Sequence, residues 1–131
     1  MIVRQKRVLI ADDETHILNV LSIKLQNAGF AVIQAEDGLS AFDLARAERP
    51  DLIITDYQMP GLSGLELCAR LQSEPATSEI PVVMLTARGF AISDEEARSG
   101  NIRRVIDKPF SPREILACAN ELLELVPAGS P

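Results

Sequence analysis

The sequence predicts a doubly wound α/β fold, in which helices cover both faces of a parallel sheet. Short apolar runs alternate with segments of helical periodicity five times along the 131 residues. This alternation is typical of right-handed crossovers between parallel strands. The length favours one domain, and a hydrophobic content of 47% is sufficient for an ordinary core.

The first part of the chain is expected to form two strand–helix units. Apolar residues 8–11 predict a strand, and residues 14–28 place apolar side chains at helical spacing. Gly29 follows as a typical helix stop. Residues 31–35 predict a weaker strand, and residues 39–48 predict a helix that ends before a proline.

The middle of the chain predicts a third unit and the strand after it. Residues 52–55 form an apolar run typical of a strand buried on both faces. Ser63 and Glu66 have the S-x-x-E spacing of a capping box, and Pro75 ends the helix that they begin. Residues 81–85 predict the fourth strand, with a proline tolerated at its first position.

The last part predicts two helices around a short strand. Ser93 and Glu96 repeat the capping-box spacing before a short helix that a glycine closes. Residues 105–106 predict a short fifth strand. A serine, a proline and a capping glutamate then open the final helix, which is expected to run from 111 to about 126.

Polar side chains follow four of the predicted strands. Asp12 and Asp13 follow the first, Asp56 the third, Thr86 the fourth and Lys108 the fifth. In an open parallel sheet, ligands bind beyond the carboxyl ends of the strands. Three clustered carboxylates repel one another unless a cation neutralises them, and oxygen ligands without His or Cys favour Mg²⁺ over Zn²⁺.

The same set of side chains predicts phosphoryl chemistry. Protein-bound Mg²⁺ usually has one or two carboxylates and oxygen atoms of a substrate phosphate among its ligands. A carboxylate can also attack phosphorus to form an aspartyl phosphate. The metal, the Lys108 ammonium and the Thr86 hydroxyl with a backbone N–H would then meet the three peripheral oxygens. Taken singly, each residue has a structural alternative as a helix cap, a partner of a helix dipole or a turn residue. Their joint occurrence at strand ends in the correct order favours the site.

Four short motifs carry a resemblance to a known family. They are Asp12-Asp13-Glu14, Asp56-x-x-Met59-Pro60-Gly61-x-x-Gly64, Thr86-Ala87 and Lys108-Pro109-Phe110. With these motifs the chain resembles a two-component response-regulator receiver domain of the chemotaxis-regulator type. The resemblance covers residues 6–126 and leaves 127–131 as a tail or linker stub. It implies a flavodoxin-like sheet in the order 2-1-3-4-5 with five helices.

The resemblance also implies roles for single residues. Asp56 would accept a phosphoryl group from a sensor histidine kinase or a phosphotransfer protein and so switch the binding of an unknown downstream protein. Asp13, Asp56 and the backbone carbonyl of Gln58 would bind Mg²⁺, with Asp12 acting mainly through water. The peptide bond before Pro109 would be cis.

The chain departs from the family pattern near its fifth strand. The family often has Tyr or Phe three residues before the conserved lysine, where this chain has Val105. In the familiar switch, the threonine hydroxyl moves toward the phosphoryl group and the ring fills the space it leaves. Because valine has no ring, we expect Thr86 to move but the signal to be read out through segment 90–104. The stretch 101–107 is also about one residue longer than usual.

Two further positions are expected to set the lifetime of the phosphoryl group. Gln58 would orient the attacking water, and the Arg88 guanidinium would shield or pair with the phosphoryl group. The resemblance to a receiver domain also implies that the protein is not an enzyme. Its own chemistry would be limited to self-phosphorylation and slow self-dephosphorylation.

Two other classes of protein use a similar fold or similar chemistry, but the sequence fits each of them less well than a signalling module. A haloacid-dehalogenase-type phosphohydrolase needs a D-x-D after its first strand and a lid, whereas this chain has an adjacent pair and no lid-sized insertion. A flavodoxin-like flavin protein needs a Ser/Thr/Gly-rich phosphate cradle and stacking aromatics, but the chain has no Trp and one Tyr.

Charge and hydropathy bound the partners and the location. The formal charge is 13 − 19 = −6, which predicts no direct binding of nucleic acid or of anionic membranes. No apolar stretch approaches the length of a membrane span, so a cytoplasmic protein is expected. Cys68 and Cys118 match no zinc or redox spacing and are interpreted as small core residues or a reduced pair.

Overall fold

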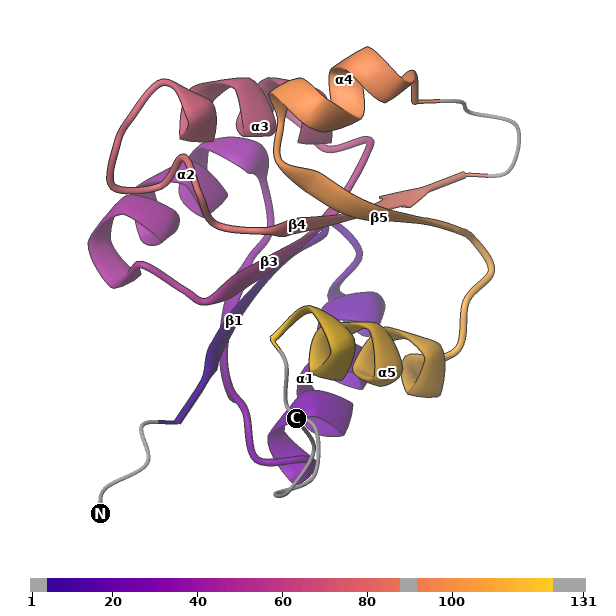
Figure 1. Cartoon of the computed structure of the whole chain (residues 1–131). Coiled ribbons are helices and arrows are strands. Elements are labelled where there is room, and N and C mark those ends of the chain that lie inside the picture. The colour runs from indigo at the N-terminus through magenta and orange to yellow at the C-terminus, as the bar shows by residue number, and fades with distance from the viewer. Residues whose placement is uncertain (1–4, 88–91, 124–131) are drawn as a thin grey trace.

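A computed structural model describes residues 5–87 and 92–123 of the chain. It contains one five-stranded parallel sheet in the order β2-β1-β3-β4-β5 (Figure 1). The strands are β1 (Arg7–Ala11), β2 (Ala31–Ala35), β3 (Leu52–Asp56), β4 (Val82–Thr86) and β5 (Ile102–Asp107). The helices are α1 (Thr15–Asn27), α2 (Gly38–Glu48), α3 (Gly64–Gln72), α4 (Asp94–Ser99) and α5 (Pro112–Leu122). The predicted fold class, strand order and number of helices are confirmed.

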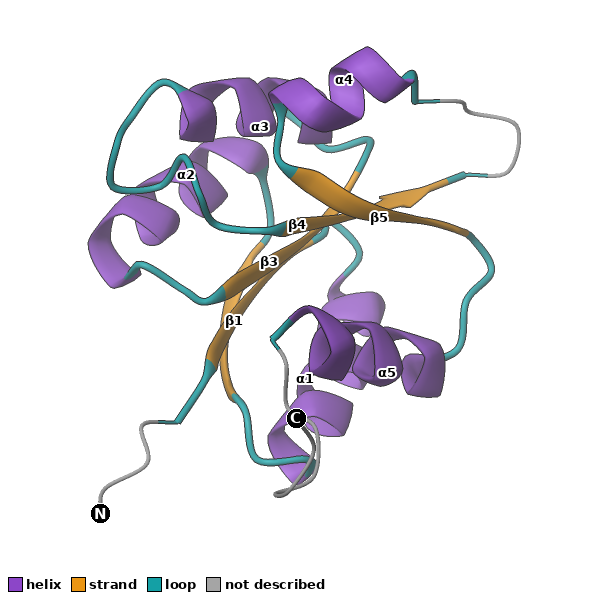
Figure 2. Cartoon of the chain, viewed as in Figure 1, coloured by secondary structure: helices purple, strands orange, loops and turns teal. Residues whose placement is uncertain are grey.

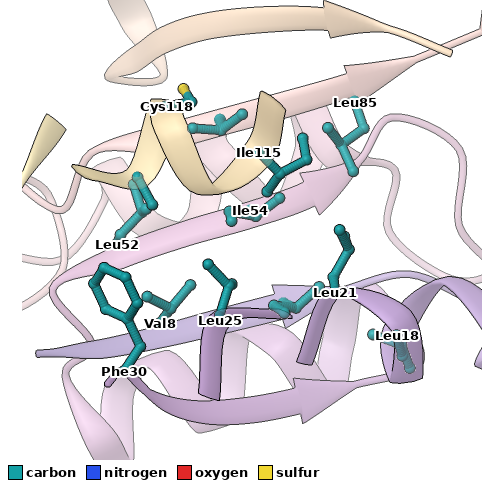
Figure 3. Packing of buried hydrophobic residues seen from close by; sticks show 13 residues of the cluster. Val8, Leu18, Leu21, Leu25, Phe30, Leu52, Ile54, Leu85, Ile115 and Cys118 are labelled. Atoms are coloured by element: carbon teal, nitrogen blue, oxygen red, sulfur yellow. The ribbon is translucent and has the colours of Figure 1, made fainter. Parts of the chain in front are cut away.

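Helices cover the sheet on both faces, with α1 and α5 on one side and α2, α3 and α4 on the other (Figure 2). Successive strand residues therefore pack into different cores, because side chains alternate across a strand. Ile54 of β3 packs with Leu25 of α1 and Ile115 of α5 in the first core (Figure 3). Its neighbour Ile53 packs with Leu67 of α3 in the second core. Burial on both faces explains the unbroken apolar run of β3.

Capping boxes define the starts of α3, α4 and α5, as the sequence predicts. Ser63, Ser93 and Ser111 each accept a hydrogen bond from the backbone N–H three residues later. The glutamate at that third position accepts one from the backbone N–H of the serine. Each box satisfies two backbone donors that the first helical turn would otherwise leave without a partner.

Strand β5 is longer than the two residues expected from the sequence. It runs from Ile102 to Asp107, and the prediction of a short strand at 105–106 is wrong in extent. Val82 pairs with Ile102, whereas Val83 pairs with Arg104, so Arg103 is an extra residue in a β-bulge. The strand lies at the sheet edge with most of its side chains exposed, which explains why it lacks an apolar run.

Cys68 and Cys118 are buried free thiols that lie in different cores. The sheet separates them, which confirms their interpretation as small core residues. Within the described parts of the chain, no helix combines the length and apolar character that crossing a membrane requires.

Candidate functional site

The carboxyl ends of four strands meet at a cleft of about 330 Å³. Its lining includes Asp13 after β1, Asp56 at the end of β3 and Lys108 after β5. Gln58 and Ala87, from the loops after β3 and β4, complete much of the rim. The topology thus brings together side chains separated by more than forty residues in places, as the strand-end pattern predicts.

A single ammonium group faces three carboxylates in this cleft. Lys108 Nζ lies 3.1 Å from Asp56 Oδ1, 3.5 Å from Glu14 Oε1 and 3.8 Å from Asp12 Oδ2. Burial lowers the pKa of Lys108, but the fields of the carboxylates outweigh that effect and leave its pKa raised. Lys108 is therefore a fixed positive charge beside the Asp56 carboxylate.

The two inner carboxylates are difficult to ionise. Burial raises the pKa of Asp12 to about 6, although its hydrogen bond from the Glu14 N–H opposes the change. Burial also raises the pKa of Asp56, against the opposing effect of Lys108. Repulsion from Asp56 further raises the pKa of Asp12, and repulsion from Asp13 further raises the pKa of Asp56. The cluster thus favours a proton or another cation.

The acidic residues fit a hard divalent cation. Oxygen atoms of Asp12, Asp13 and Asp56 all lie within 4.8 Å of one another. Asp12 Oδ2 is buried and, within the described residues, is the only buried side-chain nitrogen or oxygen atom without a hydrogen-bond partner. A carboxylate oxygen in that condition needs a cation or a water to complete its bonding. The donor set contains oxygen alone, which suits Mg²⁺.

Close backbone packing fixes the position of Asp56. A Cβ atom added at Gly64 would lie 2.6 Å from the Asp56 carbonyl oxygen and 2.6 Å from Met84 Sδ. The Gly64 N–H donates to the Tyr57 carbonyl at 2.8 Å, and the Tyr57 N–H donates to the Leu85 carbonyl at 2.8 Å. The glycine of the motif is therefore required because α3 begins directly against the loop that carries Asp56.

Thr86 is part of the strand-end set, but its hydroxyl does not face the cleft. The side chain is fully buried, and its Oγ1 donates to Asp107 Oδ1 at 2.9 Å. Asp107 precedes Lys108 and pairs directly with Thr86 in the β4–β5 register. Sequence reasoning missed Asp107. In the sequence, Asp107 can be noticed only as a carboxylate next to Lys108. That it would bond to Thr86 depends on the register between β4 and β5.

Comparison with known proteins decides the family. The protein-family model described as the response regulator receiver domain matches residues 8–120 of this chain. The chain belongs to this family.

Two curated relatives of this receiver are named as transcriptional regulators. The phosphate regulon transcriptional regulatory protein PhoB of Pseudomonas aeruginosa is 36% identical over 124 residues, covering 95% of this chain and 54% of the relative. The DNA-binding dual master transcriptional regulator RpaA of Synechocystis is 38% identical over 117 residues, covering 89% and 48%. The chain spans about half the length of the curated relatives it matches.

A solved structure supports the receiver fold. The chemotaxis response regulator CheY4 of Vibrio cholerae superposes with a TM-score of 0.83 at 29% identity, covering 91% of this chain and 99% of that chain. The predicted resemblance to chemotaxis-type receivers is confirmed. The receiver acts in two-component phosphorelay signalling, and the matches give no support to the haloacid-dehalogenase alternative.

One expectation about partners conflicts with these relatives. The absence of nucleic-acid binding was inferred from a charge of −6, and that charge describes these 131 residues alone. A relative, about half of which this chain matches, is named as a DNA-binding regulator. This relative conflicts with the expectation of no nucleic-acid binding.

Three further predictions concern the loop before α5, strand β5 and the segment after β4. The Lys108–Pro109 peptide is cis. Val105 lies on β5 with 42% of its surface exposed, and it pairs with Met84. Arg88 lies outside the described residues, as does the start of the segment 90–104, so their roles stay predictions.

Proposed function

We propose that Asp56 of this receiver accepts a phosphoryl group from a phosphohistidine of a sensor kinase or phosphotransfer protein. The observation that carries the proposal is the position of the Lys108 ammonium, 3.1 Å from Asp56 Oδ1 in an open acidic cleft. A nucleophilic carboxylate beside a fixed cation can approach an anionic phosphoryl group that it would otherwise repel.

The proposed transfer exchanges one bond to phosphorus for another. A carboxylate oxygen of Asp56 attacks phosphorus, and the bond between phosphorus and the donor imidazole nitrogen breaks. The electron pair of that bond returns to the nitrogen, which leaves with the donor histidine. Asp56 becomes an acyl phosphate, and hydrolysis later restores the carboxylate and releases inorganic phosphate.

Two positively charged groups are proposed to stabilise the charge that builds up on the phosphoryl oxygens. Lys108 would pair with one peripheral oxygen, and Asp12, Asp13 and the Gln58 carbonyl would hold Mg²⁺ with Asp56. When bound, Mg²⁺ supplies a second positive charge for the oxygens of the phosphoryl group. This assignment is supported by the clustered carboxylates and by Asp12 Oδ2, which is buried without a hydrogen-bond partner within the described residues.

The steps after transfer are proposed from the sequence. Gln58 lines the cleft with an exposed side chain, which suits a role in orienting the hydrolytic water. Arg88 is proposed to extend the lifetime of the phosphoryl group. The phosphorylated receiver would then bind a different partner surface, by shifting an existing conformational equilibrium. The cytoplasmic location remains a prediction from the sequence.

Treatment with a small phosphodonor and Mg²⁺ tests the proposal. Intact mass spectrometry should show one phosphoryl group on the wild type and none on Asp56→Asn. Asp43→Asn is the matched control, because Asp43 is an exposed carboxylate on α2 away from the cleft. Undiminished modification of Asp56→Asn would overturn the choice of acceptor. Continuous turnover of the donor without accumulation would instead support a phosphatase.

A further inference from the structure

The hydrogen bond between Thr86 and Asp107 has no place in the transfer chemistry above. We propose that Asp107 is a positioning residue that holds the Thr86 hydroxyl away from the phosphoryl site, so that phosphorylation must break this bond. The inference rests on the proposed role of Asp56 as acceptor. It assigns a regulatory function to a carboxylate that the strand-end pattern did not include.

The β-bulge at Arg103 gives Thr86 this partner. Beyond the bulge, Val83 pairs with Arg104 and Thr86 pairs with Asp107. In a regular ladder continuing from the Val82–Ile102 pair, the neighbour of Thr86 would be Ile106, which has no acceptor. The one extra residue therefore exchanges an apolar neighbour for a carboxylate.

A threonine hydroxyl has a single proton to donate. While Thr86 Oγ1 donates to Asp107 Oδ1 at 2.9 Å, it cannot donate to an oxygen of a phosphoryl group on Asp56. The two acceptors therefore compete for one proton. Before phosphorylation the phosphoryl acceptor is absent, and the hydroxyl donates to the charged Asp107 carboxylate, which forms a stronger hydrogen bond than a neutral acceptor does.

In the proposed exchange, the Thr86 side chain turns from one acceptor to the other. The Lys108 N–H donates to the Thr86 carbonyl at 2.7 Å, and this bond holds the two strands together at the point of exchange. Thr86 is fully buried, whereas Asp107 is exposed. After the exchange, water can solvate the released carboxylate, while the buried hydroxyl gains a phosphoryl oxygen as its new acceptor.

The first measurement does not depend on phosphorylation. NMR scalar couplings at the Thr86 methyl report its χ1 rotamer in the unmodified protein. We expect one rotamer in the wild type and averaging between rotamers in Asp107→Ala. Asp107→Asn retains an oxygen acceptor and should stay close to the wild type, which also guards against a folding defect in the alanine variant. An unchanged rotamer in Asp107→Ala would overturn the inference.

The second measurement is the rate of modification by a small phosphodonor with Mg²⁺. Asp107→Ala should react roughly tenfold faster than the wild type, since the hydroxyl no longer has to leave a charged acceptor. Asp107→Asn should show a smaller increase. In a Thr86→Ala background, Asp107→Ala should have no further effect, because the hydroxyl is already absent.

The outcomes separate the two proposals. If Asp107→Ala accelerates modification equally with and without the Thr86 hydroxyl, the cause is the lost negative charge and the positioning role is wrong. If the wild type is not modified at all, the proposed function fails. The rotamer measurement would still report whether Asp107 holds Thr86.

Discussion

Lys108 Nζ lies 3.1 Å from Asp56 Oδ1, across the cleft between the loop after β5 and the end of β3. This ion pair joins two residues whose positions depend on different strands. It opposes the effect of burial on the pKa of Asp56 without cancelling it. The site therefore combines a carboxylate of raised pKa with a fixed cation, and its clustered acids still favour a further positive charge.

Replacing Lys108 should destabilise the protein in a pH-dependent way. In Lys108→Met, the buried carboxylates lose their cation, so we expect the free energy of unfolding to fall by about 1–3 kcal/mol at neutral pH. Near pH 4 the loss should shrink, because protonated carboxyls need no cation. Urea denaturation at both pH values measures this. Lys6→Met, at an exposed position before β1, is the control. An equal loss at both pH values would contradict the electrostatic explanation.

Magnesium should stabilise the protein more at neutral than at acidic pH. The pKa of Asp12 in the folded, metal-free chain is about 6, above its ordinary value of 3.8. Without metal, this group favours folding when protonated, and its contribution is lost as the pH rises from about 4 through about 6. Above that range Mg²⁺ should offset this loss of stability, because it binds the deprotonated carboxylates.

Thermal denaturation tests this with and without millimolar MgCl₂. We expect the increase in Tm to be several degrees at about pH 7.5 and much smaller at about pH 5. Asp43→Asn should respond as the wild type does, since Asp43 lies outside the cluster. A metal-induced increase that is independent of pH would exclude the buried carboxylates as the source.

Two glycine substitutions should separate stability from site geometry. A Cβ at Gly64 meets the Asp56 carbonyl at 2.6 Å, and a Cβ at Gly38 meets the Leu62 carbonyl at 2.5 Å. Each alanine variant should therefore lose about 1–3 kcal/mol of stability. Only Gly64→Ala should also slow phosphorylation, because only that clash displaces the backbone of Asp56. Equal phosphorylation rates in the two variants, compared at a temperature where both are folded, would refute this.

Deletion of Arg103 should be tolerated. The deletion removes the bulge residue but keeps the pairs from Val83–Arg104 to Thr86–Asp107. The free energy of unfolding should change by less than about 1 kcal/mol, and the yield of phosphorylation should be retained. Deletion of Val105 is the control, because the chain must then shift its register or place an arginine beside Met84. If both deletions are equally harmful, the bulge itself is required for the edge strand.

Much of the site follows from the sequence because its rules are local or topological. A capping box such as Ser63 with Glu66 needs only residues three positions apart. The clustering of Asp13, Asp56 and Lys108 needs only that parallel strands end at one edge. The extent of β5 was not predictable in this way, because an exposed edge strand carries no apolar run and its pairing with β4 supplies its definition.

The alternating strands and helices, the acidic residues at the strand ends and the lysine near them can all be read from the order of residues along the chain. The acceptor of the Thr86 hydroxyl cannot be read in this way, because it is set by the packing of β4 against β5. That choice depends on the register between β4 and β5, which the bulge at Arg103 shifts by one residue. Thr86 and Asp107 are 21 positions apart, so no local pattern of either strand contains their hydrogen bond.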